Sequence, residues 1–359
     1  MRIAQVAPLA ESVPPKFYGG TERVVSWLTE ELVSRGHDVT LFATADSETS
    51  AKLIPGSACG LRLAGIRDHL ATNLVMLKHI QRLEGQFDVI HFHVDLLQHP
   101  LFDTIAHKTL TTMHGRLDLP DYMPIYRAFP KMPLVSISNH QRLPMPASTN
   151  WMATIPHGLP APACPYHPEG GKYLAFLGRI CPEKRPDRAI EIAKRSGTPL
   201  KIAAKVDPAD IDYFETKIKP LLDDPLIEFI GEIGEAEKGD FLGNALALLF
   251  PIDWPEPFGL VMIEAMSTGT PIIAWRNGSV PEVITDGESG FIVESLTEAV
   301  EAVESCRSLS RSRVRAQFED RFTVSKMADA YSDVYRALGK AGAIDKRARP
   351  LAQVARAAL

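Results

Sequence analysis

The sequence predicts an α/β protein made of two doubly wound domains with parallel sheets. Three observations lead to this prediction. The chain has 359 residues, which is long for one hydrophobic core and sufficient for two. Segments typical of strands alternate with segments of helical periodicity, which is the rhythm of a doubly wound sheet. That rhythm is interrupted near residue 160 and then starts again.

The first half contains several strand candidates and one clear amphipathic helix. Apolar residues recur at helical spacing between Thr21, the expected N-cap, and Gly36, the expected stop. The strand candidates are rich in β-branched residues and are RIAQVAP, HDVTLFAT, FDVIHFHV, KTLTTMH and PLVSIS. We therefore predict a first Rossmann-like domain over residues 1–160.

The second half repeats the pattern after a change in composition. Residues 161–171 contain three prolines and a Gly-Gly pair, which predicts a linker. A second Rossmann-like domain is predicted over residues 172–321, and a helix with a basic tail over residues 322–359, the helix crossing back to the first domain. The expected strands are KYLAFLGR, PLKIAAKV, PLIEFIG, LALLFPI and TPIIAWR, and the expected helices are RPDRAIEIAKRSG, DPADIDYFETKIKPLL, GDFLGNA and GLVMIEAMSTG.

Composition excludes several classes of protein. No run of 18 apolar residues is present, so no transmembrane helix is expected, and the N-terminus lacks the long apolar core of a signal peptide. The four cysteines have no paired spacing, which argues against a zinc site and fits a reducing cytoplasm. A net charge of −5 does not favour nucleic-acid binding. The basic last twenty residues leave open a weak contact with an anionic membrane or a solvated helix.

The stretch PEPFGLVMIEAM, residues 255–266, places two glutamates among apolar residues and glycines. A buried carboxylate without a partner is destabilising, so Glu264 either points to solvent or has a ligand. Residues 257–259 keep Glu256 in a loop, and Glu264 lies about one turn inside a helix that begins near Leu260. Carboxylate oxygens can accept hydrogen bonds from adjacent hydroxyls, so the pair suits a vicinal diol such as that of ribose.

A longer segment around these glutamates resembles the C-terminal signature of the retaining nucleotide-sugar glycosyltransferases of family four, which have GT-B architecture. The segment is EPFGLVMIEAMSTGTPIIAWRNGSVPEVITDGESGFIV. The resemblance covers nearly the whole chain, from YGGTERVV to FTVSKMADAYSDVY. In that family seven residues separate the paired glutamates, as they separate Glu256 from Glu264 here. The resemblance implies two Rossmann-like domains whose parallel sheets face each other across a cleft, the first on the acceptor side and the second binding the nucleotide sugar.

The resemblance also implies roles for the residues of this signature. Glu264 is expected to bind the ribose of the donor nucleotide, and Glu256 is expected to contact the hexose. The backbone amides of Phe258, Gly259 and Leu260 are expected to lie near the sugar and the diphosphate.

Two cations in LGRICPEKRP form a second candidate constellation. Arg179 ends a predicted strand, and Lys184 precedes a helix that begins near Pro186. Two cations beside a helix N-terminus suit a diphosphate, although a solvated basic loop is the alternative. The family has Arg and Lys at matching positions and often has Gly where this sequence has Arg185. Because a nucleoside diphosphate would be the leaving group, these charges should act mainly in the transition state.

The first half carries weaker landmarks. Gly19-Gly20 allows the backbone to approach a ligand before a helix, although such pairs are also common turns. In the family this loop lies by the diphosphate and the donor sugar. His114 matches a family histidine that contacts the donor sugar and supports the charge developing at the anomeric carbon. His91 and His93 share a face of a strand, but without an evident third ligand they are interpreted as core or cleft-wall residues.

One further motif is interpreted as structural. Asp210-Ile211-Asp212 has the spacing by which other sugar transferases hold a divalent metal, but it opens a predicted helix after Pro208, where acids favour the helix dipole. We therefore predict no metal and no cofactor.

The function that follows is transfer of a hexose from a nucleoside-diphosphate sugar to an acceptor hydroxyl, with retention of anomeric configuration. The chain would be a cytoplasmic, metal-independent enzyme of polysaccharide or glycoconjugate biosynthesis, with its acceptor and oligomeric state left open. The alternatives are a non-catalytic sugar-nucleotide-binding protein and a GT-B-like epimerase or phosphorylase. A dinucleotide-dependent enzyme is disfavoured because no G-x-G-x-x-G follows the first strand.

Overall fold

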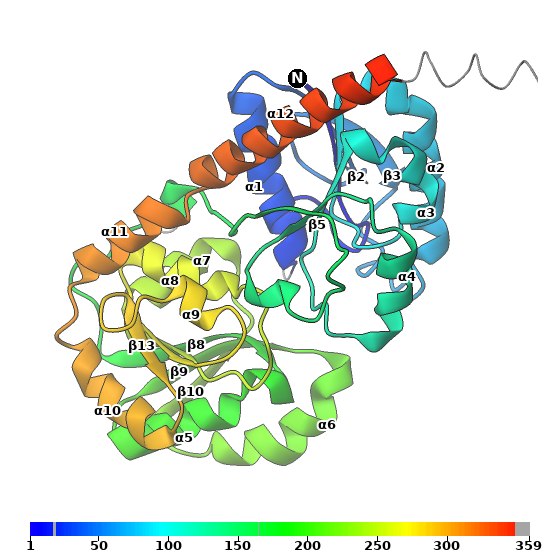
Figure 1. Cartoon of the computed structure of the whole chain (residues 1–359). Coiled ribbons are helices and arrows are strands. Elements are labelled where there is room, and N and C mark those ends of the chain that lie inside the picture. Colours follow the sequence, from blue (N-terminus) through cyan, green and yellow to red (C-terminus); the bar gives the residue numbers. More distant parts are fainter. Residues whose placement is uncertain (17–18, 164, 349–359) are drawn as a thin grey trace, which may run out of the picture. The chain divides into compact units, whose positions relative to one another are not determined.

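The computed structural model describes residues 1–16, 19–163 and 165–348, with side chains described up to residue 340 except for Pro162 (Figure 1). The chain divides into two compact units. The first contains residues 1–137, 142–156 and the chain from residue 324 onward. The second contains residues 138–141 and 157–323. Each unit is built on one parallel sheet.

The sheet of the first unit has seven parallel strands in the order β3-β2-β1-β4-β5-β6-β7. The order reverses between β1 and β4, as in a doubly wound fold. The strands are β1 (Arg2–Val6), β2 (Asp38–Thr44), β3 (Lys52–Ser57), β4 (Val89–Phe92), β5 (Thr109–Thr112), β6 (Leu134–Ser136) and β7 (Trp151–Thr154).

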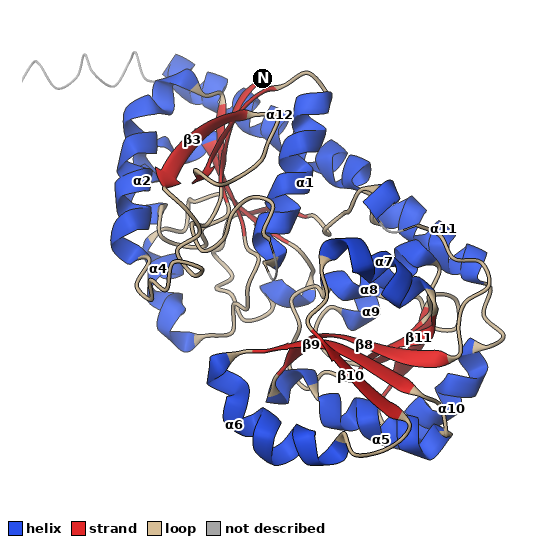
Figure 2. Cartoon of the chain, turned by 180° about the vertical axis from the view of Figure 1, so that it is seen from behind, coloured by secondary structure: helices blue, strands red, loops and turns tan. Residues whose placement is uncertain are grey.

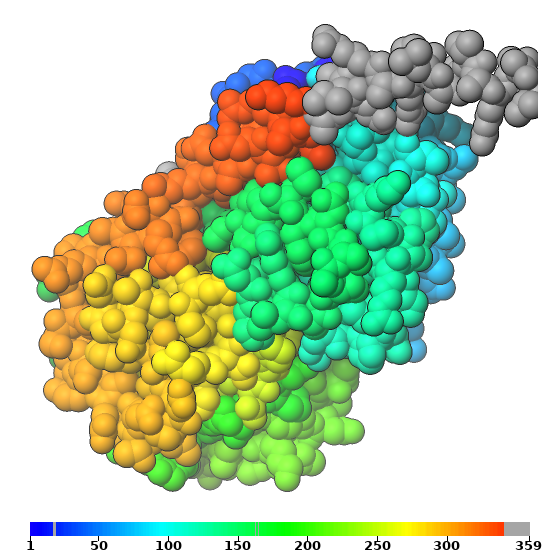
Figure 3. Space-filling view, in the orientation of Figure 1, coloured from blue at the N-terminus to red at the C-terminus, as the bar shows by residue number. Residues whose placement is uncertain are grey.

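Helices accompany this sheet, and the last of them comes from the far end of the chain. The helix α12 packs against α1, while α2 packs against α3. Part of α12 lies at the surface, where it is drawn in red in Figure 3. The helices of this unit are α1 (Gly20–Ser34), α2 (Leu70–Leu83), α3 (His99–Phe102), α4 (Met123–Ala128) and α12 (Val324–Ala348).

The sheet of the second unit has six parallel strands in the order β10-β9-β8-β11-β12-β13. This is again the doubly wound order, and it reverses between β8 and β11. The strands are β8 (Tyr173–Ile180), β9 (Leu200–Val206), β10 (Ile227–Gly231), β11 (Ala245–Phe250), β12 (Ile272–Trp275) and β13 (Gly290–Val293). The predicted class, two Rossmann-like units with parallel sheets, is confirmed.

Helices cover both faces of this second sheet (Figure 2). On one face lie α7 (Glu235–Gly243), α8 (Leu260–Thr268) and α9 (Val280–Val283), and α7 packs against α8. On the other lie α5 (Pro186–Ser196), α6 (Ile211–Tyr213) and α10 (Leu296–Cys306), and α5 packs against α10. The helix α11 (Arg311–Arg321) packs against α8.

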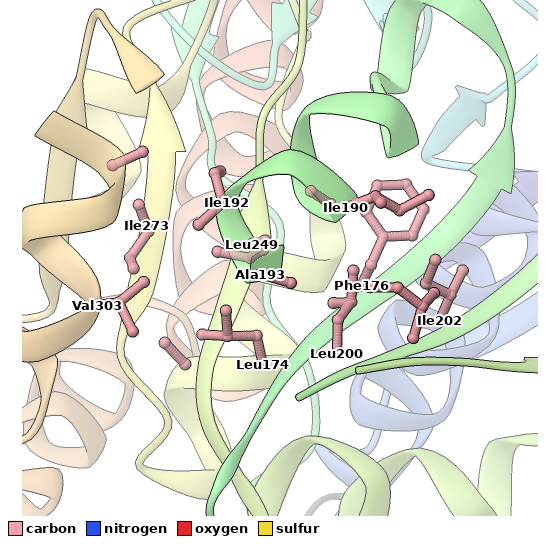
Figure 4. Packing of buried hydrophobic residues seen from close by; sticks show 14 of the residues in the cluster. Leu174, Phe176, Ile190, Ile192, Ala193, Leu200, Ile202, Leu249, Ile273 and Val303 are labelled. Carbon is pink, nitrogen blue, oxygen red and sulfur yellow. The ribbon is translucent and has the colours of Figure 1, made fainter. Parts of the chain in front are cut away.

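The core between the sheet and the α5/α10 layer is mainly aliphatic. Figure 4 shows side chains of β8, β9, β11 and β12 pointing toward those of the two helices. The strand side chains include Leu174, Phe176 and Leu249, and the helix side chains include Ile190 and Val303. Burial of this kind contributes roughly 1.5–3 kcal/mol for each large side chain. The core therefore fixes the strand ends rigidly, which matters because the candidate site residues stand there.

Several predicted elements differ in detail. The helix expected to be capped by Thr21 begins two residues earlier than expected, with Gly19 as its N-cap. The helix expected over residues 207–222 is a series of short pieces, α6 flanked by 3-10 turns (Pro208–Asp210 and Lys219–Leu221) and a π-helical turn (Phe214–Ile218). Pro220 explains this break, because it has no amide hydrogen and its ring clashes with the preceding turn.

Other elements gave no clear sequence signal. The edge strands β3, β7 and β13 were not predicted, and neither were α2, α10 and α11, while α7 begins four residues before the expected segment. Edge strands are exposed on one side, so their hydrophobic pattern is weak.

The unit boundaries also differ from the expected ones. The first break falls after residue 156 rather than 160, residues 161–171 belong to the second unit, and the chain returns to the first unit at residue 324. The short segment 138–141 joins the second unit because the carboxylate of Glu282 in α9 accepts hydrogen bonds from the amides of Asn139 and His140, both at 2.7 Å. The expected basic tail lies mostly outside the described residues.

Candidate functional site

The candidate residues of the second unit gather where its strand order reverses. Arg179 stands near the carboxyl end of β8, and Lys184 closes the turn that follows, Pro182–Lys184. Glu256 follows β11, the parallel neighbour of β8, and Glu264 lies in the helix after it. In open α/β sheets this switch point is the usual place for a ligand, because loops diverge there and leave room between them.

Lys184 and Glu256 form an ion pair at this point. The Nζ of Lys184 contacts the Oε2 of Glu256, and the indole Nε1 of Trp254 donates to the same oxygen at 3.1 Å. The ammonium also stands over the rings of Phe250 and Trp254, at 5.4 and 5.2 Å from their centroids. Both charged side chains are largely buried, so the pair is stronger than one in water.

Arg179 is held by two carboxylates. Its guanidinium lies 3.4 Å from Glu183 and 3.4 Å from Asp210. Asp210 thus faces a cation. The 3-10 turn Pro208–Asp210 is capped by Asp207, whose carboxylate accepts a hydrogen bond from the amide of Ala209. Asp210 is the N-cap residue of α6, so it opens a helix as expected, but its carboxylate makes no capping hydrogen bond there. Within the described residues, no group of three or more His, Cys, Asp or Glu side chains is arranged to hold a metal ion.

Arg185, where the family often has glycine, adopts a left-handed backbone with φ of 53°. That conformation favours glycine, which explains the family preference. Here the side chain is tied down instead: Nε and Nη2 donate to Asp187 at 2.9 and 2.7 Å, and Nη1 donates to Asp253 at 3.0 Å. The departure from the family pattern leaves the turn that carries Lys184 in place.

Glu264 does not face solvent, since only 5% of the residue is exposed. Its Oε1 lies 3.2 Å from the Nζ of Lys238 in α7, and the same ammonium lies 3.0 Å from Glu235. The carboxylate in the apolar helix therefore has a partner within the protein. Sequence reasoning missed Lys238, because nothing local marks a lysine on one helix as the partner of an acid on another.

The start of α8 is shaped by glycine. Gly259 is the N-cap of the helix in a left-handed conformation, φ 81°, and a Cβ there would lie 2.8 Å from Met262. Phe258 is buried against His157 and Phe322, with ring centroids 4.9 and 6.1 Å apart. The first amides of a helix have no partner within it, so the amides after Gly259 are ready-made anion donors.

A second glycine holds the Glu256 loop. The backbone of Gly278 lies so close that a Cβ would be 2.3 Å from the carbonyl oxygen of Glu256. The amide of Ser279 donates to that carbonyl at 2.9 Å, and its hydroxyl donates to the carbonyl of Phe258 at 2.8 Å. The downstream G-S-V-P-E stretch thus braces the loop between the two glutamates.

The remaining predicted residues belong to the first unit. Gly19 and Gly20 open α1, and a Cβ on Gly19 would lie 2.7 Å from that of Pro15, so this turn has no room for a side chain. His114 follows β5, is partly exposed, and faces His93 at 2.8 Å between ring nitrogens. Burial lowers the pKa of His114 to about 3. At neutral pH its ring is therefore uncharged.

Two family models match this chain. The model described as glycosyl transferases group 1 matches residues 165–321, and the model described as glycosyltransferase family 4 matches residues 18–142. A phosphatidyl-myo-inositol mannosyltransferase of Mycolicibacterium smegmatis is 26% identical over 327 residues, which is 82% of this chain and 81% of the relative.

Solved structures give the same fold. AviGT4, a glycosyltransferase involved in avilamycin A biosynthesis, is 21% identical with a TM-score of 0.71 over 95% of this chain and 98% of its own. HepE of Anabaena, in complex with UDP and glucose, is 15% identical with a TM-score of 0.72 over 94% of this chain and 100% of its own. At these identities the likeness establishes the fold alone, and that fold is GT-B.

Proposed function

Since the chain belongs to glycosyltransferase family four, we propose that it moves a hexose from a nucleoside-diphosphate sugar to an acceptor hydroxyl. The reaction proposed retains the anomeric configuration and needs no metal ion. The observation that carries the proposal is the arrangement at the switch point of the second sheet. There Arg179, Lys184 and Glu256 stand at neighbouring strand ends, and the buried Glu264 lies one turn into the next helix.

This arrangement supports the proposal because it offers partners for the ribose, the diphosphate and the hexose of a sugar nucleotide. The carboxylate of Glu264 would accept hydrogen bonds from the ribose hydroxyls. The guanidinium of Arg179, the ammonium of Lys184 and the first amides of α8 would bind the diphosphate. Glu256 would bind the hexose, and Lys184 would hold that carboxylate in position.

The two cations would act mainly as the bond to the leaving group breaks. Negative charge then grows on the diphosphate oxygens, and preorganised donors stabilise such charge without further reorganisation. Both cations are already oriented by carboxylates, Arg179 by Glu183 and Asp210, and Lys184 by Glu256. These contacts would supply, in place of a metal ion, the positive charge that the phosphates need.

Retention is proposed to proceed by displacement on the same face of the sugar, with the departing phosphate accepting the proton of the acceptor hydroxyl. A double displacement would require a carboxylate nucleophile beneath the anomeric carbon, and none of the candidate residues is assigned that role. In the first unit, Gly19 and Gly20 are proposed to approach the diphosphate and the donor sugar, and the neutral ring of His114 is proposed to contact the sugar.

A donor screen tests the proposal. UDP-, GDP- and ADP-sugars are offered to the protein, and both binding and slow donor hydrolysis are measured, with and without a metal chelator. One nucleotide sugar should bind and be hydrolysed in the presence of chelator. The proposal fails if no sugar nucleotide binds while a nicotinamide or pyridoxal cofactor does. Binding of a sugar nucleotide without any transfer or hydrolysis would favour the non-catalytic alternative. Conversion of the donor to an isomer without loss of its sugar would favour an epimerase, and cleavage that requires inorganic phosphate would favour a phosphorylase.

The acceptor is proposed to lie at a membrane surface, with the protein cytoplasmic and weakly attached. Among the described residues, no helix combines the length and the apolar character needed to span a bilayer. On α2, however, the apolar side chains of Leu70, Leu74 and Val75 are exposed beside the basic Lys78 and Arg82. Such a face suits an anionic interface. The M. smegmatis relative is named for phosphatidyl-myo-inositol, which makes a lipid headgroup the first acceptor to test.

Co-sedimentation with vesicles tests this attachment. Vesicles of anionic lipid should retain the protein, and vesicles of zwitterionic lipid should retain much less of it. The change Val75→Glu should reduce retention without affecting the hydrolysis of a sugar nucleotide in solution. Equal retention by both kinds of vesicle, or by neither, would contradict the proposed contact.

A further inference from the structure

A chain of buried hydrogen bonds connects the terminal helix α12 to His114 within the first unit. Its members come from four elements that are far apart in the sequence. They are Tyr331 and Tyr335 of α12, Gln5 of β1, His91 and His93 at the end of β4, and Thr112 at the end of β5. Each of these side chains is at most 2% exposed. Burial on this scale means that each polar atom depends on its protein partner, because water cannot replace it.

Gln5 lies at the centre of this series of hydrogen bonds and has two partners. Its Nε2 donates to the hydroxyl of Tyr335 at 3.1 Å, and its Oε1 lies 2.8 Å from the Nε2 of His93. On the other side of His93, Nδ1 lies 2.8 Å from the Nε2 of His114. Three short contacts therefore separate a tyrosine of the last helix from the candidate catalytic histidine.

A second branch leaves the same tyrosine. The hydroxyl of Tyr335 lies 2.8 Å from the Nδ1 of His91, whose Nε2 lies 2.7 Å from the hydroxyl of Thr112. Thr112 in turn lies 2.8 Å from the hydroxyl of Tyr331. Tyr335 is thus the junction of both branches, while Tyr331 is the end of one.

The positions of the ring protons between Gln5 and His114 follow from the orientation of the Gln5 amide. An amide oxygen only accepts, so the Nε2 of His93 carries a hydrogen. A neutral imidazole has one N–H, so the Nδ1 of His93 is an acceptor and the Nε2 of His114 donates to it. The opposite orientation of the amide would reverse both rings. The tautomer of His114 therefore depends on whether the nitrogen or the oxygen of the Gln5 amide faces Tyr335.

Tyr335 meets the nitrogen of the Gln5 amide in the structure, and a reversed amide would require Tyr335 and His91 to exchange donor and acceptor roles as well. Its hydroxyl accepts from the amide of Gln5 and can donate to the Nδ1 of His91, and His91 then donates from Nε2 to Thr112. Every group in both branches has its donors and acceptors matched in this arrangement. We propose that Tyr335 is a positioning residue that, through Gln5 and His93, holds His114 as the Nε2–H tautomer.

The charge state of the rings agrees with this assignment. Burial lowers the pKa of His91 well below its usual value and lowers that of His114 to about 3. Both rings are then neutral near pH 7 and each has a defined tautomer. A protonated histidine ring has two N–H donors, so one of them would point at another donor in the network and that hydrogen bond would be lost.

Only the effect of this tautomer on the sugar substrate rests on the proposed function. With Nε2–H directed at His93, the Nδ1 of His114 carries the lone pair. A neutral ring with an acceptor nitrogen can take a hydrogen bond from a sugar hydroxyl, and it places no positive charge beside the developing cationic carbon. Tyr335, which is more than two hundred residues from His114 along the chain, would in this way select the ring nitrogen that meets the substrate.

The test measures the tautomer directly in the full-length protein. Histidine is labelled with a heavy nitrogen isotope, and long-range proton–nitrogen correlation spectra give the protonated nitrogen of each ring. The change His114→Gln assigns the His114 signals. The unaltered protein should show His114 as the Nε2–H form, and the change Tyr335→Phe should produce a mixture of both forms. The matched control is Tyr331→Phe, which removes a hydroxyl from the same buried helix face but only from the end of a branch. In it His114 should stay as Nε2–H.

Each outcome decides the proposal. It is overturned if His114 is the Nδ1–H form in the unaltered protein, a measurement that needs no variant, or if Tyr335→Phe leaves the tautomer unchanged. It is also overturned if both tyrosine changes alter His114 equally, since that would be a general loss of packing. In an enzyme assay, Tyr335→Phe should lower kcat by about tenfold with little change in the KM for the donor. If no sugar nucleotide is turned over, the proposed function fails while the tautomer result stands.

Discussion

Lys238 and Glu264 form a buried ion pair between neighbouring helices of the second unit, with the Nζ of Lys238 3.2 Å from the Oε1 of Glu264. The pair explains how an apolar helix tolerates a carboxylate, since an unpaired buried charge would be far more destabilising. Lys238 is shared with Glu235 at 3.0 Å, and only one oxygen of Glu264 is engaged by it. The carboxylate therefore retains acceptor capacity for a ligand.

Replacing Lys238 should destabilise the protein. In the variant Lys238→Met, Glu264 would stay buried without its cation, so the free energy of unfolding should fall by about 1–3 kcal/mol. Chemical denaturation measures this difference. The control is Lys219→Met, which breaks a similar pair with Glu215 whose side chains are about half exposed. That change should cost less than about 1 kcal/mol. If both variants lost the same free energy of unfolding, the buried pair would contribute no more to stability than the exposed one.

Replacing Glu264 should weaken the binding of the bare nucleoside diphosphate as well as that of the sugar nucleotide. Loss of hydrogen bonds from a charged acceptor predicts an affinity about 10- to 100-fold lower for Glu264→Gln, measured by calorimetry. A nucleoside diphosphate without its 2′ and 3′ hydroxyls provides the control. It should bind the unaltered protein and the variant equally, and a further loss of its affinity in the variant would remove the ribose role.

Replacing Lys184 should affect turnover more than donor binding. Charge on the leaving diphosphate grows in the transition state, so Lys184→Met should lower kcat by about 100-fold and change the donor Kd by much less. The matched variant is Lys194→Met, which removes a cation of α5 that pairs with Asp224 at the surface. Steady-state kinetics should show no effect there. A loss in Kd that equals the loss in kcat would make Lys184 a ground-state binding residue.

Arg185 allows a test of backbone conformation. Both Arg185→Gly and Arg185→Ala remove the ion pairs with Asp187 and Asp253. Only the alanine variant keeps a Cβ at a left-handed φ of 53°, so the glycine variant should be more stable by about 1 kcal/mol. Urea denaturation measures the difference. The opposite order would show that this turn adopts another backbone conformation in solution.

Stability should fall as the solution is acidified. His99 is buried against Tyr126 and Phe129, and burial lowers its pKa from 6.5 to about 4. Between these values the unfolded chain binds a proton that the folded protein does not, so the contribution is complete above 6.5 and is lost as the pH falls. From about pH 7 to about pH 5 this amounts to about 2 kcal/mol.

The variant His99→Phe isolates this contribution. Neither ring nitrogen of His99 has a hydrogen-bond partner among the described residues, so phenylalanine should be tolerated and should remove its share of the pH dependence. The free energy of unfolding, measured by denaturation at both pH values, should change less in the variant. An unchanged slope would assign the acid sensitivity to other groups, such as His91 and His114, which are also held neutral by burial.

The sequence by itself determined the features that depend on near neighbours in the chain. The alternation of strands and helices, the start of α8 at Leu260 and its end at Gly269 follow from hydrophobic period and from the backbone freedom of glycine. Glu256 stands outside that helix for the same local reasons. The switch point of the second sheet follows in turn, because right-handed crossovers leave few possible strand orders.

Tertiary structure alone decided which side chains meet. Lys238 reaches Glu264 across two helices, Asp210 reaches Arg179 across two strand ends, and Gln5 bonds to Tyr335 across most of the chain. Local preference acts over one or two turns of a helix, whereas these partners are set by how whole elements pack. The physical reason is that a buried polar group must be satisfied where the core places it, by whichever residue the fold brings within hydrogen-bonding distance.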